Sequence, residues 1–266
     1  MRTFRFMSVV VLAVTALALP ASASAKPTIT LSGSTSVAPL ASKLAKAYIK
    51  KHKVRFKILQ GGSDLGVSDV AHGRVTLGMS SRDPLPSDPG GLQFNRIARD
   101  GICVATNPGN PIGNLSQDQI QGIFSGRVRS WSQVPGARVG GTIDLIVRNA
   151  ASGTQDAFQN IFMGQNLRVA PSASQKPSNG RVQQAIASDK NAIGYVDFNF
   201  TRGLHTVNYK GVGCSLRNAK SGQYGGIRNF WLVSRGKASG AAAAWIKWIR
   251  SAAARRIIAS NWVPIK

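Results

Sequence analysis

The sequence predicts an α/β fold with largely parallel sheets. Two observations favour this class. Strand-like and helix-like segments alternate along most of the chain, and three corners rich in glycine and hydroxyl side chains each stand between a strand and a helix. In addition, 43% of the 266 residues are hydrophobic, which is enough to bury one or two sizeable cores.

In the first half of the chain, apolar residues recur at helical spacing in some segments and form short or alternating runs in others. Leu40, Leu44, Ala47 and Tyr48 share one helical face, and Ser116 is a suitable N-cap for a later helix. These patterns predict strands over 28–31, 54–59, 75–79 and 101–106, and helices over 37–50, 65–71 and 116–124.

The same alternation continues in the second half. It predicts strands over 142–148, 192–196 and 227–233, and helices over 154–162, 181–187 and 238–254. In the last helix, Trp245, Ile246, Trp248 and Ile249 stand among basic residues, so this helix either lies on a membrane surface or docks onto the body. The strand-like ending NWVPIK that follows favours docking.

The first 25 residues have the layout of a secretory signal peptide. Arg2 and Arg5 precede an apolar run, and Ala23-Ser24-Ala25 forms an A-x-A cleavage site. The apolar run is short for a membrane span, and no other stretch could cross a membrane. We therefore expect an exported protein, cleaved after Ala25 and not embedded in the membrane; the alternative is an uncleaved anchor.

The chain is strongly basic, with 34 Lys and Arg against 10 acidic residues and a formal net charge of +24. Every acidic residue is Asp. Such a field favours anionic partners. The basic residues are spread along the chain and are not interleaved with aromatic residues that stack on bases, so no nucleic acid is expected. A basic surface protein that binds polyanions is an alternative of a different class.

Cys103 and Cys214 are the only two cysteines, and in an exported protein they either form a disulfide or stay as two buried thiols. There is no Cys-x-x-Cys, and the three histidines share no ligand spacing, so we expect no metal and no other cofactor. The chain also lacks a G-x-S-x-G nucleophile motif and a histidine in a recognisable base position. We therefore expect a protein that is not an enzyme.

The three corners are GSTS over 33–36, GGSDLG over 61–66 and ASGT over 151–154. Each would expose unpaired backbone N–H groups at the start of a helix, where the helix dipole favours a bound anion. In the third corner, Ser152 and Gln155 have the spacing of a capping box. In open α/β sheets, ligands bind at the carboxyl ends of the strands, so we expect the corners to form one oxyanion-binding cleft.

Two arginines strengthen this hypothesis. Arg148 precedes the third corner, and Arg82 follows the predicted strand 75–79 within the stretch SSRD. A guanidinium matches a tetrahedral oxyanion with two parallel hydrogen bonds. Both arginines are therefore candidates for anion binding.

Four stretches resemble the periplasmic phosphate-binding proteins of ABC importers, the PstS-like group: ITLSGSTSVAPL, GGSDLGV, NPIGNLSQDQIQGIFSGRVRSWSQV and RNAASGTQDAF. IGYVDF, SGQYGGIRNFWLV and NWVPIK follow in the order of that group. The resemblance implies a type II periplasmic-binding-protein fold with two lobes around a hinge, each a mixed, mostly parallel sheet flanked by helices. It places lobe I at 26–101 and 206–266, and lobe II at 102–205.

The resemblance also implies the residues that hold the anion between the lobes. Beside Arg82, they are Thr35, Ser36, Ser63, Arg148, Ser152, Gly153 and Thr154. The expected ligand is inorganic phosphate, delivered to the membrane subunits of an ABC importer by a monomer. The alternative within the same fold is another oxyanion, such as sulfate, or a role as an anion sensor.

This chain departs from the family pattern at two positions. Many members have an aspartate after the strand, where it accepts the proton of hydrogen phosphate, but Arg82 stands there in this sequence. Asp64 and Asp83 are nearby candidates for the acceptor, and Asp64 is preferred; the alternative is that Asp64 caps a helix or pairs with Arg82. The acidic partner expected two residues after Arg148 is replaced by Ala150, so other groups must orient Arg148.

Overall fold

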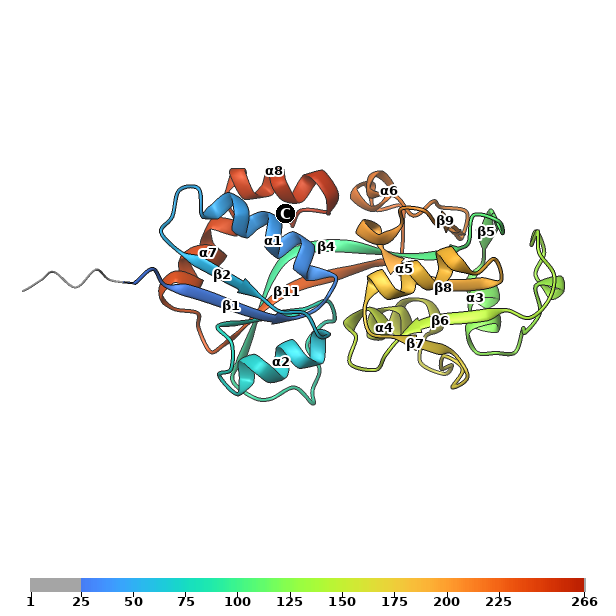
Figure 1. Cartoon of the computed structure of the whole chain (residues 1–266), viewed down its shortest axis with the longest axis horizontal. Coiled ribbons are helices and arrows are strands. Elements are labelled where there is room, and N and C mark those ends of the chain that lie inside the picture. Colours follow the sequence, from blue (N-terminus) through green and yellow to red (C-terminus); the bar gives the residue numbers. More distant parts are fainter. Residues whose placement is uncertain (1–24, 266) are drawn as a thin grey trace, which may run out of the picture.

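Two halves, each with its own strands and helices, lie side by side along the long axis of the molecule (Figure 1). The structure is a computed structural model that describes residues 25–265. Apart from Ala25, the predicted signal peptide lies outside the described residues. The α/β class and the two-lobed architecture are confirmed.

The first lobe is built on five strands in the order β2-β1-β3-β11-β4. β1 pairs in parallel with β2 and β3, whereas β11 is antiparallel to both β3 and β4. The strands are Thr28–Gly33 (β1), Arg55–Ile58 (β2), Leu77–Ser80 (β3), Leu92–Thr106 (β4) and Ile227–Arg235 (β11). Each of these five strands overlaps a strand predicted from the sequence, but the first part of β4 was not predicted.

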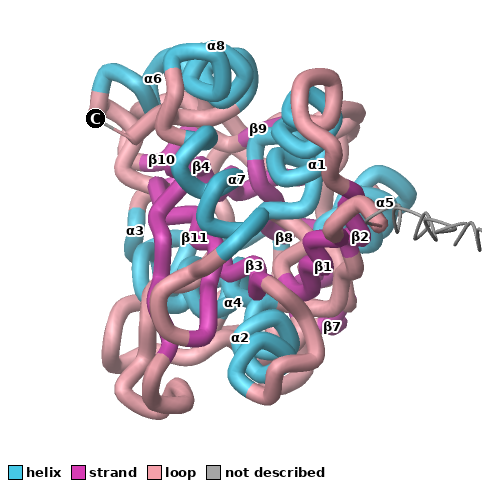
Figure 2. Tube along the Cα trace, turned by 90° about the vertical axis from the view of Figure 1, so that its left-hand side faces the viewer, coloured by secondary structure: helices cyan, strands magenta, loops and turns pink. Residues whose placement is uncertain are grey.

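Helices cover both faces of this sheet. Seen from the first-lobe end in Figure 2, α8 and α2 lie on opposite sides of the strands, and Figure 1 places α1 and α7 on the side of α8. The helices are Val37–Tyr48 (α1), Ser63–Ala71 (α2), Gly240–Ile249 (α7) and Ala252–Asn261 (α8). The main core of the lobe lies between the sheet and the first, seventh and eighth helices.

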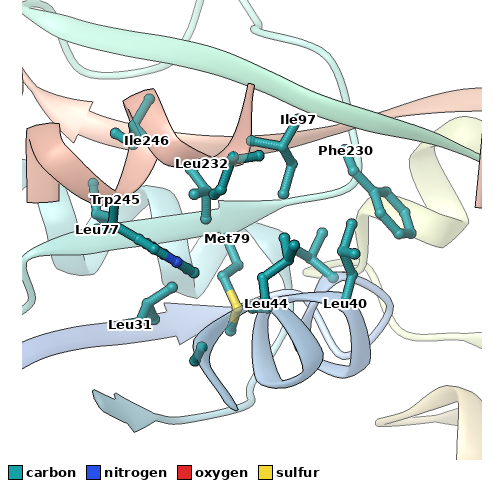
Figure 3. Packing of buried hydrophobic residues seen from close by; sticks show 14 of the residues in the cluster. Leu31, Leu40, Leu44, Leu77, Met79, Ile97, Phe230, Leu232, Trp245 and Ile246 are labelled. Carbon is teal, nitrogen blue, oxygen red and sulfur yellow. The ribbon is translucent and has the colours of Figure 1, made fainter. Parts of the chain in front are cut away.

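Figure 3 shows this core, where Leu31, Leu77 and Met79 from the strands meet Leu44 of α1 and Trp245 of α7. The Trp245 side chain is fully buried. The apolar face of α7 is therefore docked onto the body, as the ending NWVPIK favoured.

The prediction of one continuous helix over 238–254 is wrong. Residues 240–249 and 252–261 form two helices. Ser251 between them has an extended backbone with ψ of 160°, and its hydroxyl accepts a hydrogen bond from the Ala254 N–H. A serine N-cap begins a new helix and changes the chain direction, which an apolar pattern that runs through both helices does not reveal.

The second lobe continues from the far end of β4. Residues 102–106 of β4 pair with β8, and the order β4-β8-β6-β7 completes the sheet. The remaining strands are β5 (Asn114–Leu115), β6 (Asp144–Arg148), β7 (Ser174–Lys176), β8 (Ala192–Asp197), β9 (His205–Thr206) and β10 (Asn208–Tyr209). The helices are α3 (Gln117–Phe124), α4 (Gly153–Phe158), α5 (Asn179–Ser188) and α6 (Leu216–Ser221), with a π turn over Gln159–Met163 and 3₁₀ turns over Trp131–Gln133 and Phe198–Phe200.

The two crossings between the lobes lie side by side. β4 passes from one lobe to the other at Gly101, and the Ile102 N–H donates to the Gly226 carbonyl at 2.8 Å just before β11 begins. Val207, Tyr209 and Tyr224 pack in the core of the second lobe. The return point expected at residue 206 therefore needs correction, because that segment packs on lobe II. We propose that lobe II extends over 102–226.

A disulfide joins Cys103 of β4 to Cys214, with 5.5 Å between the two Cα atoms. It holds the segment before α6 against the second lobe. Because the bond closes a loop between residues 111 apart in sequence, breaking it is expected to lower the free energy of unfolding by about 2–5 kcal/mol. Urea midpoints of the oxidised protein and of a Cys103→Ala/Cys214→Ala variant measure this effect, and equal midpoints would contradict it.

Within residues 25–265, no helix combines the length and the apolar character that a membrane span requires. In the same range, no three His, Cys, Asp or Glu side chains are gathered as a metal site would require.

Candidate functional site

Loops that follow the strands of both lobes meet at the boundary between the lobes. β1 and β3 run parallel in the first lobe, and β6 and β8 run parallel in the second, so their carboxyl ends bring these loops together. The side chains at this boundary are polar and buried, at most 5% exposed: Ser34, Thr35, Ser36, Ser63, Ser81, Arg148, Ser152, Thr154, Asn179, Asp197 and Arg228. A polar cluster buried to this degree requires partners for its hydrogen-bonding groups.

The three predicted corners come together here. The Ser36 Oγ and the Thr154 Oγ1, from opposite lobes, lie 3.1 Å apart. The Asp64 N–H at the second corner donates to the Ala151 carbonyl of the third at 3.2 Å. Gly153 also lies at this contact, where an added Cβ would be 2.4 Å from the Ser63 Oγ. The lobes are therefore in direct contact through the predicted binding residues.

In the first lobe, the hydroxyls form a chain. The Ser34 Oγ accepts from the N–H groups of Ser36 and Val37 at the start of α1 and donates to the Ser81 Oγ at 2.9 Å. The Ser63 Oγ accepts from the Ser81 N–H at 3.0 Å and lies 3.3 Å from the Ser81 Oγ. When Ser81 donates to it, the Ser63 hydroxyl keeps its own hydrogen for a ligand.

In the second lobe, the Ser152 Oγ accepts from the Thr154 and Gln155 N–H groups at 3.1 and 3.4 Å. Only this half of the predicted capping box forms, because the Gln155 side chain accepts from the Tyr195 hydroxyl instead. The Tyr195 hydroxyl in turn accepts from the Arg148 N–H at 3.0 Å. Tyr195 therefore ties the end of β6 to the start of α4.

Arg148 points across the boundary, where its Nη1 donates to the Thr35 Oγ1 at 3.3 Å. Its Nε and Nη2 donate to the carbonyls of Lys176 and Pro177 at 3.2 and 2.9 Å, and these carbonyls take the place of the acidic partner missing at Ala150. The ion pairs among residues 25–265 do not include Arg148. Because it is buried, its pKa is lowered to about 10. A buried cation held only by neutral groups favours an anion as its partner.

The backbones of Arg82 and Asp64 lie at this contact between the lobes, but their side chains bond to each other and not to the hydroxyl groups. The Arg82 guanidinium donates to Asp64 at 2.7 Å and to both oxygens of Asp88 at 2.6 and 3.0 Å. The Asp64 side chain is 49% exposed. Asp83, the other candidate acceptor, binds Asn229 and Trp231. The alternative for Asp64, a salt bridge with Arg82, is therefore the one found in the structure. It occupies the guanidinium group of Arg82.

Sequence reasoning missed four buried residues at the boundary. Arg228 donates from Nη1 to the Thr154 Oγ1 and from Nη2 to the Ser36 Oγ, both at 2.8 Å, and Nη2 also lies 3.1 Å from Asp100. Asn179 donates to the Ser36 Oγ at 2.7 Å and to Asp197 at 3.1 Å. A charged residue within an apolar strand pattern, as in GGIRNFWLV and IGYVDF, is the signal that would have identified Arg228 and Asp197.

Asp100→Asn is expected to make the free energy of unfolding fall less steeply as the pH rises. Burial, and then repulsion from Asp197, raise the pKa of Asp100 well above its ordinary value. When folding raises the pKa of a carboxyl group, the group contributes its full stabilisation below the unfolded pKa of about 3.9. This stabilisation is lost as the pH rises through the higher pKa of the folded state. Urea midpoints of both proteins from pH 4 to 9 check this. An equally steep decline in the variant would contradict the expectation.

The fold and the site together define a two-lobed binding protein with a buried, basic and hydroxyl-lined site between its lobes. Residues 19–253 match the family model described as a PBP superfamily domain, and the chain belongs to this superfamily.

Three known proteins show the relationship in more detail. A structure from Clostridium perfringens, described as a phosphate ABC transporter substrate-binding protein with bound phosphate, is 29% identical with a TM-score of 0.84, over 90% of this chain and 100% of that one. An ABC-type phosphate transport receptor from Vibrio cholerae is 26% identical with a TM-score of 0.72, over 89% of this chain and 100% of that one. The phosphate-binding protein PstS of Bacillus subtilis is 25% identical over 91% of this chain and 82% of its own length.

Proposed function

We propose that this protein captures inorganic phosphate between its lobes and delivers it to the membrane subunits of an ABC importer. The observation that carries the proposal is the buried Arg148 guanidinium, which has neutral partners and faces hydroxyl groups from both lobes. Such donors suit a tetrahedral oxyanion. The bound phosphate of the similar C. perfringens protein supports this choice of ligand.

The ligand would be held by Thr35, Ser36, Ser63, Arg148, Ser152, Gly153 and Thr154. The backbone N–H groups at the start of α4 add donors at the positive end of a helix dipole. Because the residues come from both lobes, binding energy would favour the closed arrangement. Arg82 would act indirectly, since its guanidinium is occupied by Asp64 and Asp88.

Export is part of the proposal, with residues 1–25 as a signal peptide cleaved after Ala25. The disulfide between Cys103 and Cys214 supports an oxidising compartment, where such bonds persist. The protein would act as a periplasmic monomer without catalysis.

Sulfate is the second candidate ligand, and the exposure of Asp64 favours it. Hydrogen phosphate has a proton to donate and sulfate has none, so a buried acceptor would distinguish them. Asp64 is paired with Arg82 at 2.7 Å and is half-exposed, so it is poorly placed for this role. Discrimination between phosphate and sulfate would then depend on other groups at the boundary between the lobes.

Asp64→Asn is accordingly expected to leave the ratio of phosphate to sulfate affinity within about threefold of wild type, because a surface salt bridge contributes only about 0–1 kcal/mol. Competition titrations on both proteins measure the ratio. A tenfold or greater shift toward sulfate would instead return Asp64 to the acceptor role.

Calorimetric titration tests the function directly. The purified protein is unfolded with its disulfide intact, dialysed and refolded, because a tightly bound anion can co-purify with it. One-to-one binding of phosphate that excess sulfate does not displace is the expected result. Preferred binding of sulfate would change the ligand within the same site. If neither anion binds, the proposal is wrong, and the basic surface of +24 becomes the feature to explain, with salt-dependent heparin or DNA binding as its test.

A further inference from the structure

Arg228 occupies a position at the hinge from which it reaches both lobes. It lies on β11, paired across the sheet with Asp100 of β4, immediately beyond the second crossing. Its guanidinium donates to Ser36 of the first lobe and to Thr154 of the second, each at 2.8 Å. The side chain is almost completely buried. The proposed ligand set does not include it, because both of its Nη atoms already donate to the hydroxyls that are proposed to bind.

The hydrogen-bond count at Ser36 determines the direction of its hydroxyl. A serine oxygen has two acceptor lone pairs and one hydrogen. The Ser36 Oγ accepts from Arg228 at 2.8 Å and from the Asn179 amide at 2.7 Å, and a guanidinium can only donate. With both lone pairs occupied, Ser36 has only its hydrogen to offer to any other neighbour.

The same count applies to Thr154. Its Oγ1 accepts from Arg228 and lies 3.1 Å from the Ser36 Oγ. Since Ser36 has no free lone pair, a hydrogen bond between them must run from Ser36 to Thr154. Thr154 then accepts twice and presents its own hydrogen elsewhere. Arg228 and Asn179 therefore make donors of these two hydroxyls at the lobe boundary.

Two carboxylates surround the charge of Arg228. Its Nη2 lies 3.1 Å from the Asp100 Oδ2 and 3.5 Å from the Asp197 Oδ2, and both carboxylates are fully buried. Asn179 also donates to Asp197 at 3.1 Å. Arg228 therefore has acidic partners inside the hinge, in contrast to Arg148, whose partners are neutral. The effect of Arg228 on a ligand would come from the direction of its hydrogen bonds and not from net charge.

We propose that Arg228 is a positioning residue of the anion site: by occupying lone pairs of Ser36 and Thr154, it makes Ser36 donate to Thr154 across the lobes and leaves the hydrogen of Thr154 for the anion. This role rests on the proposed function. It has a consequence for selectivity, because a fixed donor at Thr154 meets an oxygen without a hydrogen, which both anions have, and leaves the hydrogen of hydrogen phosphate to an acceptor elsewhere in the site. Without Arg228, the hydroxyls gain lone pairs that can accept that hydrogen.

The test must separate this role from simple charge balance. Arg228→Gln alone leaves two buried carboxylates without their cation, which destabilises the fold for reasons unrelated to the ligand. The informative variant is therefore Arg228→Gln/Asp100→Asn, which removes both members of the Arg228–Asp100 pair relative to wild type, with Asp100→Asn alone to report the effect of the lost carboxyl group. Arg235→Gln, at the exposed end of the same strand, is the control for an arginine-to-glutamine change.

Calorimetry with phosphate and with sulfate, together with the melting temperature of the anion-free protein, provides the readouts. We expect the double variant to bind phosphate at least tenfold more weakly than Asp100→Asn, and sulfate more weakly still, and its melting temperature shows whether it is folded at the temperature of the titration. Equal affinities and an equal phosphate-to-sulfate ratio in the two proteins would overturn the role. If the wild-type protein binds neither anion, the proposed function fails and the role fails with it, so the two failures are distinguishable.

Arg228→Lys keeps the proposal testable if the double variant does not fold. Lysine retains the charge beside Asp100 and Asp197 but lacks the planar fork that reaches two hydroxyls at once. We expect it to fold, to bind phosphate at least tenfold more weakly than wild type, and to show the same shift in ratio. Wild-type affinity for both anions in this variant would overturn the role.

Discussion

Arg148→Ala is expected to weaken phosphate binding by about 2–5 kcal/mol, because it removes a desolvated, charge-assisted contact at the lobe boundary. Burial lowers the pKa of Arg148 to about 10, so holding this charge inside the protein is itself unfavourable. Its removal also leaves the Lys176 and Pro177 carbonyls without this donor, so the stability of the anion-free protein is compared separately from its affinity. Calorimetric titration and urea unfolding of the anion-free protein measure the two effects separately.

The matched control for this variant is Arg127→Ala. Arg127 lies in the same lobe but is exposed, so it tests whether the loss of one positive charge from a strongly basic protein is sufficient. Binding by Arg127→Ala should be close to wild type at moderate salt, where exposed charges are screened. If Arg148→Ala also binds phosphate as tightly as wild type, the site assignment is wrong.

The sequence predicts those parts of the site that are local in the chain. The corners at Ser36, Ser63 and Thr154 each follow a strand and begin a helix, and strand order then brings their loops to one boundary. Arg148 is predictable for the same reason, since it ends a strand next to a corner. Each of these residues owes its position to a short-range rule and to the general location of ligand sites in α/β sheets.

The residues that were not predicted are placed by contacts between segments that lie far apart in the sequence. Arg228 meets Ser36 across 192 positions and Thr154 across 74, and no periodicity within β11 indicates such contacts. The direction of the Arg82 side chain was missed for a related reason. Asp88 lies only six residues away, but the loop that turns it back toward Arg82 has no regular pattern. Charge partners of this kind depend on tertiary structure.

The boundary of the second lobe shows a further limit. The segment that contains Val207 and Tyr209 is short and weakly patterned, and it could have belonged to either core. Its position on lobe II follows from pairing of β9 with β4 and of β10 with β5, and from the bond between Cys103 and Cys214. Neither pairing nor bonding partners can be derived from spacing alone, because strands of two residues carry no periodicity.

Gly153→Ala is expected to prevent closure and so to weaken phosphate binding by about 3 kcal/mol or more, at the upper end of the range for overpacking. A Cβ at this position would lie 2.4 Å from the Ser63 Oγ, 2.7 Å from the Arg82 N and 2.9 Å from the Ser81 C. The Ser63 hydroxyl can rotate away, but the two backbone atoms cannot move without separating the lobes. Gly153 is the first residue of α4, where alanine is at least as favourable as glycine.

The backbone of α4 can therefore accept alanine at position 153, and the clash arises only where the two lobes meet. The melting temperature of the anion-free variant should be equal to that of wild type or higher, and small-angle scattering should show an extended particle with and without phosphate. Gly180→Ala is the matched control, since Gly180 is the second residue of α5 in the same lobe and its nearest neighbouring atom would be 3.8 Å from an added Cβ. Wild-type affinity in Gly153→Ala would show that the anion binds without this approach of the two lobes, whereas loss of binding in both variants would point to an effect within lobe II.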